Sequence, residues 1–137
     1  MQTANGRALI AGDAEGELLY TDEPLSFWGG FDARSGDIID TRHTLIGQNV
    51  RGKILALPYS RGSSTGSGLL LEGIRLGTAP LAMILSKPDA ILALGAIVAR
   101  ELYEKTMPLV VVSAYAFAQL GSARRVQVCA NGEIHWD

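Results

Sequence analysis

The sequence predicts a mixed α/β domain with a β-rich N-terminal half, a parallel β-α-β unit and a C-terminal β-hairpin. Three observations carry this prediction: glycine-punctuated apolar runs before residue 58, alternating strand-like and helix-like segments up to residue 112, and an Asn-Gly turn near the C-terminus. The chain has 137 residues, of which 47% are hydrophobic. That length suits one domain with a buried core, so we expect a single domain over residues 1–137.

The N-terminal half has the composition of short strands. Residues 7–12 and 17–21 are apolar runs, and turn-forming residues 13–16 lie between them, so we predict a hairpin here. Residues 26–32 then place three aromatic side chains around a Gly-Gly pair. Residues 50–57 have the length and composition of a further strand, which Pro58 ends.

The sequence changes character after Pro58. Residues 59–68 form a small polar loop, and the spacing of apolar residues from Leu69 to Leu76 predicts a helix. The serines of the loop can cap this helix, and Gly77 can end it.

The alternation continues towards the C-terminus. A strand is predicted over residues 79–85, a helix capped by Asp89 over residues 90–103, and a strand over residues 109–112. This order predicts parallel strands joined by right-handed crossovers. A short helix near residues 115–120 and a hairpin around Asn131-Gly132, between residues 124–129 and 133–136, complete the chain.

Composition excludes several function classes. Twelve basic and fourteen acidic residues are spread along the chain and give a formal charge of −2, so a nucleic-acid footprint is not indicated. The longest uncharged apolar run, residues 90–99, is shorter than the ~20 residues that cross a bilayer. Cys129 is the only cysteine, so this chain alone builds no disulfide and no multi-cysteine metal or cluster site. We expect a cytoplasmic domain that binds no nucleic acid, membrane, metal or cofactor by itself.

The segment Arg61-Gly62-Ser63-Ser64 is the strongest candidate site. It precedes a predicted helix, whose first turn leaves about four backbone N–H groups unpaired and therefore attracts anions. A serine that acts as a base needs neighbouring positive charge, which Arg61 and the helix terminus supply. Helix capping alone is the competing explanation, because serines are common just before a helix.

Other residues offer weaker signals. His43 is either a surface or a turn-stabilising histidine, and His135 has no partner at metal or triad spacing. Trp28 beside Gly29-Gly30 is either a pocket wall or a core residue at a tight bend. Cys129, in an alternating strand, has the pattern of a small buried hydrophobe. No nucleotide P-loop or dinucleotide-binding motif is present.

A series of motifs between residues 26 and 102 carries a resemblance to a known family. In order they are Ser26-Phe27-Trp28-Gly29-Gly30-Phe31-Asp32, Gly36-Asp37-Ile38-Ile39-Asp40 with His43, Leu57-Pro58 with Arg61-Gly62-Ser63-Ser64-Thr65-Gly66-Ser67, Gly77-Thr78-Ala79-Pro80, and Leu92-Ala93-Leu94-Gly95-Ala96. This set resembles the small subunit, or swivel domain, of aconitase X-type dehydratases.

The resemblance implies a swivelling β/β/α domain that closes over a large subunit holding an iron–sulfur cluster. It also implies the elimination of water from a small hydroxy acid. In the wider aconitase superfamily the first serine of a Gly-Ser-Ser motif removes the α-proton, and Gly62-Ser63-Ser64 matches that motif. The resemblance therefore implies that Ser63 is the catalytic base and that Arg61, Gly62 and Ser64 bind substrate.

The matched motifs also supply a candidate pocket wall, formed by Trp28, Gly29, Gly30, Asp32 and His43. The chain departs from the family pattern at Thr44, where proline is expected, and at Ser60, where glycine is expected.

Two activities of the family are relevant to the substrate: cis-3-hydroxy-L-proline dehydratase and phosphomevalonate dehydratase. Nine arginines against three lysines favour a bacterial over a hyperthermophilic host, and with it cis-3-hydroxy-L-proline. Two alternatives of other classes remain: a non-catalytic anion-binding or regulatory module of the same fold, and a self-contained hydrolase that uses Ser63.

Overall fold

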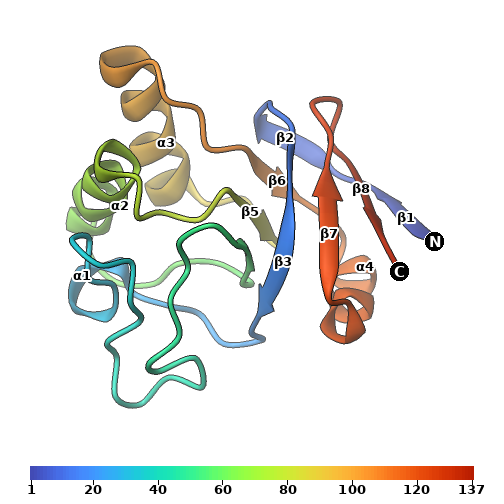
Figure 1. The fold of residues 1–137 in the computed structure, drawn as a ribbon, viewed down its shortest axis with the longest axis horizontal. Helices are drawn as coiled ribbons and strands as arrows, with labels where there is room; N and C mark the ends of the chain where they lie inside the picture. The colour runs from blue at the N-terminus through green and yellow to red at the C-terminus, as the bar shows by residue number, and fades with distance from the viewer.

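A computed structural model describes residues 1–137, in which eight strands form one nearly closed sheet. The strands are β1 (Gln2–Asn5), β2 (Arg7–Ile10), β3 (Ala14–Tyr20), β4 (Ile54–Ala56), β5 (Ala82–Leu85), β6 (Leu109–Val111), β7 (Arg125–Val128) and β8 (Glu133–Trp136). The helices are α1 (Phe27–Gly30), α2 (Thr65–Leu76), α3 (Ala90–Tyr103) and α4 (Ala114–Gln119), the last followed by a 3-10 turn, η1 (Leu120–Ser122). The strand order is β1-β8-β7-β3-β4-β5-β6-β2, and Figure 1 shows the helices α2 and α3 beside it.

The predicted parallel β-α-β unit is confirmed. Strands β3, β4, β5 and β6 pair in parallel, with α2 crossing from β4 to β5 and α3 crossing from β5 to β6. Every residue of β4 and β5 is buried, as expected for strands that are covered on both faces.

Two separate cores explain why both faces are covered. Because successive side chains of a strand point to opposite faces, Leu55 packs into the core that includes Leu70 of α2 and Leu92 of α3. Its neighbour Ile54 packs into a second core, which includes Trp136 of β8. The layers are therefore helix, parallel sheet and antiparallel sheet, which is the predicted β/β/α arrangement (Figure 1).

The N-terminal strands join the two ends of the sheet. β1 pairs with β8, and β2 pairs with β6 at the opposite end of the strand order. Gly6 lies between them and donates its N–H to the carbonyl of Gly132 at 2.9 Å. A Cβ atom at Gly6 would stand 2.4 Å from Cγ1 of Val110, so only glycine allows this close approach.

The predicted hairpin between residues 7–12 and 17–21 is wrong. β2 pairs with β6, whereas β3 pairs with β7 on one side and with β4 on the other. Residues 14–16, predicted as a turn, belong to β3. Because both edges of β3 are taken by distant strands, β2 finds its partner elsewhere.

Most other elements agree with the prediction, with shifted ends. The helix over residues 90–103 is confirmed with the same bounds, and the C-terminal hairpin is confirmed as β7 and β8. The strand expected over residues 50–57 is reduced to β4, because Gly52 turns the chain with a φ of +75°. The helix expected from Leu69 already begins at Thr65.

The short helix expected near residues 115–120 is found as α4. The strand β1 was not predicted. None of the helices combines the length and the apolar composition that a membrane-spanning segment needs.

Candidate functional site

The candidate site is a loop, residues 60–64, that we call the serine loop. It follows the carboxyl end of β4 and leads into α2. In sheets of parallel strands, ligands bind outside the carboxyl ends of the strands, because the connecting loops and helix N-termini meet there. The serine loop therefore occupies the part of the fold where a ligand is expected.

The hydroxyl of Ser63 is held in a defined position at the start of α2. Its Oγ accepts the N–H of Thr65 at 3.0 Å and donates to Oγ1 of the same threonine at 2.9 Å. Ser64, at the N-cap position, makes no side-chain cap bond. Ser63 is exposed, so its hydroxyl is bonded locally and remains accessible.

The serine loop presents several free donors. The backbone N–H groups of Gly62, Ser63 and Ser64 have no acceptor within the chain. The guanidinium of Arg61 is exposed and has no carboxylate within 4.0 Å. Together with the positive end of the α2 dipole, these donors can bind an anionic group.

Gly62 allows the loop to pass close to the segment before α1. Its φ is +96°, and a Cβ atom here would lie 2.9 Å from Oγ of Ser26. The Ser26 hydroxyl donates to the carbonyl of Trp28 at 2.8 Å, and the N–H of Arg61 donates to the carbonyl of Leu25 at 3.2 Å. The structure thus brings the aromatic segment, residues 26–32, into contact with the serine loop.

Trp28 and Gly29 lie next to the start of α2 and face solvent. The side chain of Trp28 is 61% exposed, and a Cβ atom at Gly29 would have no neighbour within 4 Å. A Cβ atom at Gly66 would lie 3.8 Å from the backbone nitrogen of Trp28, which places the first turn of α2 beside the aromatic segment. Phe27 and Phe31 fill the core instead, with ring centroids 5.3 Å apart.

Gly30 and Asp32 lie on the inner side of the same motif. A Cβ atom at Gly30 would approach Cδ1 of Leu25 to 3.1 Å, so the backbone is closely packed here. Asp32 is half-buried, and its Oδ1 accepts the N–H of Arg34 at 2.9 Å. No hydrogen bond connects Asp32 to the serine loop, and its visible role is to stabilise its own turn.

His43 is buried, with 3% of its surface exposed, so it is not a surface histidine. Its Nδ1 accepts the N–H of Leu45 at 3.1 Å, and its Nε2 lies 3.4 Å from the carbonyl oxygen of Glu23. This pattern places the proton on Nε2 and stabilises the turn in which His43 lies. No hydrogen bond joins His43 to Ser63.

Asp89 is a functional candidate that sequence reasoning recognised only as a helix cap. Its Oδ1 accepts the N–H of Leu92 at 3.0 Å, which confirms the cap of α3. Its Oδ2 accepts both the N–H and the hydroxyl of Ser60, at 2.6 and 2.7 Å. The cap pattern identified the residue, but nothing in the sequence indicated that its second oxygen reaches the serine loop.

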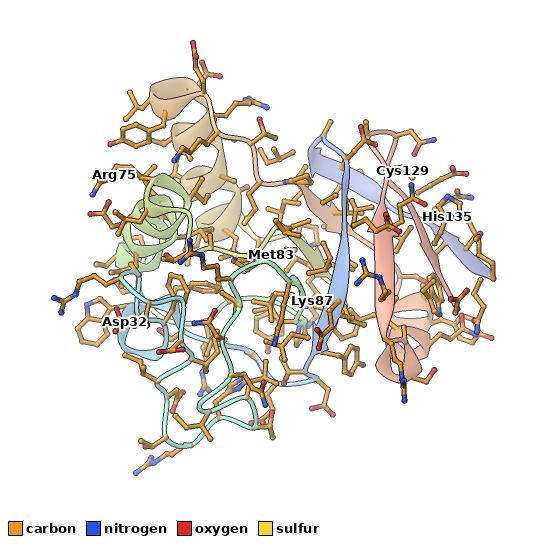
Figure 2. The ribbon with its side chains drawn as sticks, viewed as in Figure 1. Asp32, Arg75, Met83, Lys87, Cys129 and His135 are labelled. Carbon is orange, nitrogen blue, oxygen red and sulfur yellow. The ribbon has the colours of Figure 1, made fainter.

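The residues of this chain do not fit an iron–sulfur cluster or a metal ion. No group of three histidine, cysteine or acidic side chains converges anywhere in the structure. Cys129 lies at the end of β7, and Figure 2 shows it on the opposite side of the molecule from α2. Burial, and then the charges of Asp13 and Glu133, raise the pKa of its thiol, which disfavours the thiolate form that binds metals.

The serine loop lies on an open surface. The surface cavities lie elsewhere; the largest, about 490 Å³, is lined by Glu17, Leu18, Ala123, Arg124 and Arg125. None of the cavities includes a residue of the serine loop. A closed site around Ser63 therefore requires a surface that this chain does not provide.

Comparison with known proteins places this fold and loop in a family. The sequence profile described as the aconitase X swivel domain matches residues 3–136. The chain belongs to the aconitase X swivel domain family. This aconitase X swivel domain is similar over its whole length to the crystal structure of Thermococcus kodakaraensis aconitase X in its holo form. The TM-score is 0.89, with 32% identity over 100% of this chain and 99% of that one.

Two curated relatives show different relations to this domain. Cis-3-hydroxy-L-proline dehydratase of Pseudomonas aeruginosa is 50% identical over 86% of this chain and 22% of its own length. The phosphomevalonate dehydratase small subunit of Thermococcus onnurineus is 37% identical over 92% of this chain and 91% of its own length. The chain thus spans about a fifth of the first relative and nearly all of the second.

Proposed function

We propose that this aconitase X swivel domain is the small subunit of a heteromeric hydro-lyase that dehydrates a small hydroxy acid, with Ser63 as the base. The observation that carries the proposal is the setting of Ser63. Its exposed hydroxyl stands at the N-terminus of α2, in a loop that has unpaired backbone N–H groups and that also carries Arg61. The relatives named as dehydratases support the reaction class.

The chain's own part in the reaction is a proton transfer. The Ser63 alkoxide takes the proton from the carbon next to the substrate carboxylate, and the C–H electron pair forms the new double bond as the C–O bond breaks. The Thr65 N–H, 3.0 Å from Ser63 Oγ, donates to that oxygen and favours its anionic form. Arg61 and the free N–H groups stabilise the negative charge that develops on the substrate.

The second half of the site comes from a large-subunit partner in this proposal. Ser63 lies outside every cavity of the chain, so a partner surface must close the site and exclude water. The iron–sulfur cluster implied by the family belongs to that partner, because the donors for it are not present in this chain. Departure of the hydroxyl is therefore assigned to the partner.

Cis-3-hydroxy-L-proline is the favoured substrate. The relative that carries this name is 50% identical, against 37–44% for the phosphomevalonate dehydratase small subunits. Phosphomevalonate is the second candidate, because relatives of that name match this chain over 91% and 93% of their own length. Both are hydroxy acids, so the same base and anion-binding loop serve either substrate.

The test is reconstitution of this chain with an aconitase X large subunit, followed by mass-spectrometric detection of water loss from each substrate. We expect one of the two to be dehydrated. Ser63→Ala is expected to lower kcat by about 10²–10⁴-fold, the range typical of general-base catalysis, with little change in KM. Near-normal turnover by Ser63→Ala would exclude Ser63 as the base.

Reconstitution tests one alternative function, and a labelling experiment tests the other. A non-catalytic binding module predicts no dehydration with any large subunit, although the complex still forms. A self-contained hydrolase predicts labelling of Ser63 by a fluorophosphonate probe. Against it stands the absence of a histidine partner, since His43 bonds to Leu45 and His135 lies beside Thr3.

A further inference from the structure

We propose that Asp89 is a positioning residue that holds the serine loop, through Ser60, in the conformation in which Ser63 removes the proton. The catalytic part of this inference rests on the proposed function. The part that concerns the loop's conformation stands on the hydrogen bonds of the chain alone.

The carboxylate of Asp89 is unusually well placed to hold a loop. It is 8% exposed and accepts hydrogen bonds from Leu92 and, twice, from Ser60. No basic side chain lies within 4.0 Å of it, so its negative charge is met by these donors and by the N-terminus of α3. Hydrogen bonds to a buried carboxylate are stronger than neutral ones, which makes Ser60 a firm attachment point.

The first turn of α2, directly after the serine loop, is fixed to the same part of α3. Ser67, in the first turn of α2, donates its hydroxyl to the carbonyl of Ile91 at 2.6 Å. A Cβ atom at Gly95 would stand 2.7 Å from the carbonyl oxygen of Ser67, so α2 and α3 touch at this point. Both ends of the segment that contains Ser63 are therefore attached to the start of α3, by Asp89 before it and by Ile91 after it.

This arrangement gives Asp89 a role that a helix cap alone does not have. A cap needs only Oδ1, which accepts from Leu92. Oδ2 accepts its two hydrogen bonds from Ser60, the residue directly before Arg61. The hydroxyl of Ser60 adds a second bond to the one that its backbone N–H makes, so the residue is held to Asp89 by two contacts.

The first measurement uses the chain itself and follows hydrogen exchange by NMR. The reporters are the Arg61, Thr65 and Gly66 amides, which donate to Leu25, Ser63 Oγ and the Ser63 carbonyl respectively. In Ser60→Ala and in Asp89→Asn we expect these amides to exchange about 10-fold faster or more, because local opening becomes easier. Unchanged exchange in both variants would overturn the proposal.

Ser113→Ala is the matched control. It removes a cap bond of the same kind, from Ala116 N–H to Ser113 Oγ at 3.1 Å, at the start of α4. We expect no change in the serine-loop amides of this variant. A third variant, Ser60→Thr, keeps the hydroxyl and is expected to restore the exchange rates that Ser60→Ala loses.

The second measurement uses the complex with the large subunit. Ser60→Ala and Asp89→Asn are expected to lower kcat by about 10-fold or more, as for a misplaced catalytic group, with KM changed less than about 3-fold. Ser60→Thr and Ser113→Ala are expected to retain kcat. If kcat survives in Ser60→Ala and Asp89→Asn while Ser63→Ala is inactive, the positioning role is wrong. If the unaltered complex is inactive, the proposed function fails, and the exchange data still decide whether Asp89 holds the loop.

Discussion

Gly62 is the position where a single methyl group is expected to damage the serine loop most directly. In Gly62→Ala the new Cβ would lie 2.9 Å from Ser26 Oγ, and the backbone would keep a φ of +96°. Holding a non-glycine residue in such a conformation costs about 1–3 kcal/mol. Displacing Ser26 also breaks its bond to the Trp28 carbonyl, worth about 1 kcal/mol.

We therefore expect Gly62→Ala to lower the free energy of unfolding by about 2–4 kcal/mol. Gly68→Ala is the matched control, because a Cβ atom there has open space around it inside α2. Alanine at such a helical position is expected to stabilise the protein by about 0.5–1 kcal/mol. Urea denaturation of both variants measures the difference. Equal effects of the two substitutions, or a stable Gly62→Ala, would refute the assigned loop conformation.

Three further predictions concern the rest of the domain. Phe27→Ala is expected to cost about 3–5 kcal/mol of unfolding free energy because Phe27 is buried, whereas Trp28→Ala should stay within about 0.5 kcal/mol; comparable losses would contradict their assigned burial. Gly132→Ala, with φ at +92° and a Cβ 2.4 Å from the Gly6 carbonyl oxygen, is expected to cost about 3 kcal/mol or more, and a normal denaturation midpoint would argue against the close contact. Because burial and nearby carboxylates raise the pKa of the Cys129 thiol, its thiolate forms only at higher pH. Iodoacetamide at mildly alkaline pH should thus alkylate Cys129 more slowly than it alkylates glutathione, and a faster reaction would disagree with the raised pKa.

Local signals predicted the elements whose structure is decided locally. The helix α3 has its predicted bounds because Asp89 caps it through a residue of its own first turn. The β7–β8 hairpin follows from Asn131-Gly132, where Gly132 takes the positive φ that such a turn needs. In both cases the interacting residues lie a few positions apart, so a short segment of sequence is enough to predict the element.

Non-local pairing explains what the sequence did not predict. β1 is a short, mostly exposed strand without the alternation that signals burial, and it is a strand only because β8 pairs with it. The choice of β6 rather than β3 as the partner of β2 depends on the closed arrangement of the whole sheet. At the site, the segment Arg61-Gly62-Ser63-Ser64 could be recognised from the sequence. The contacts of Ser60 with Asp89, and of Gly62 with Ser26, join segments far apart in the chain.

The pairing of β1 with β8 brings the two chain ends together. Gln2 lies opposite Trp136, so the N- and C-termini leave the domain side by side, on the side away from α2 and α3 (Figure 1). A domain with adjacent ends can be connected to another polypeptide through either end, or through both, without stretching its own sheet. This geometry is compatible with relatives in which the matched region is 22% of a long chain and with others in which it is 91% of a short one. Both points of connection therefore lie away from α2, the helix at whose start the serine loop is found.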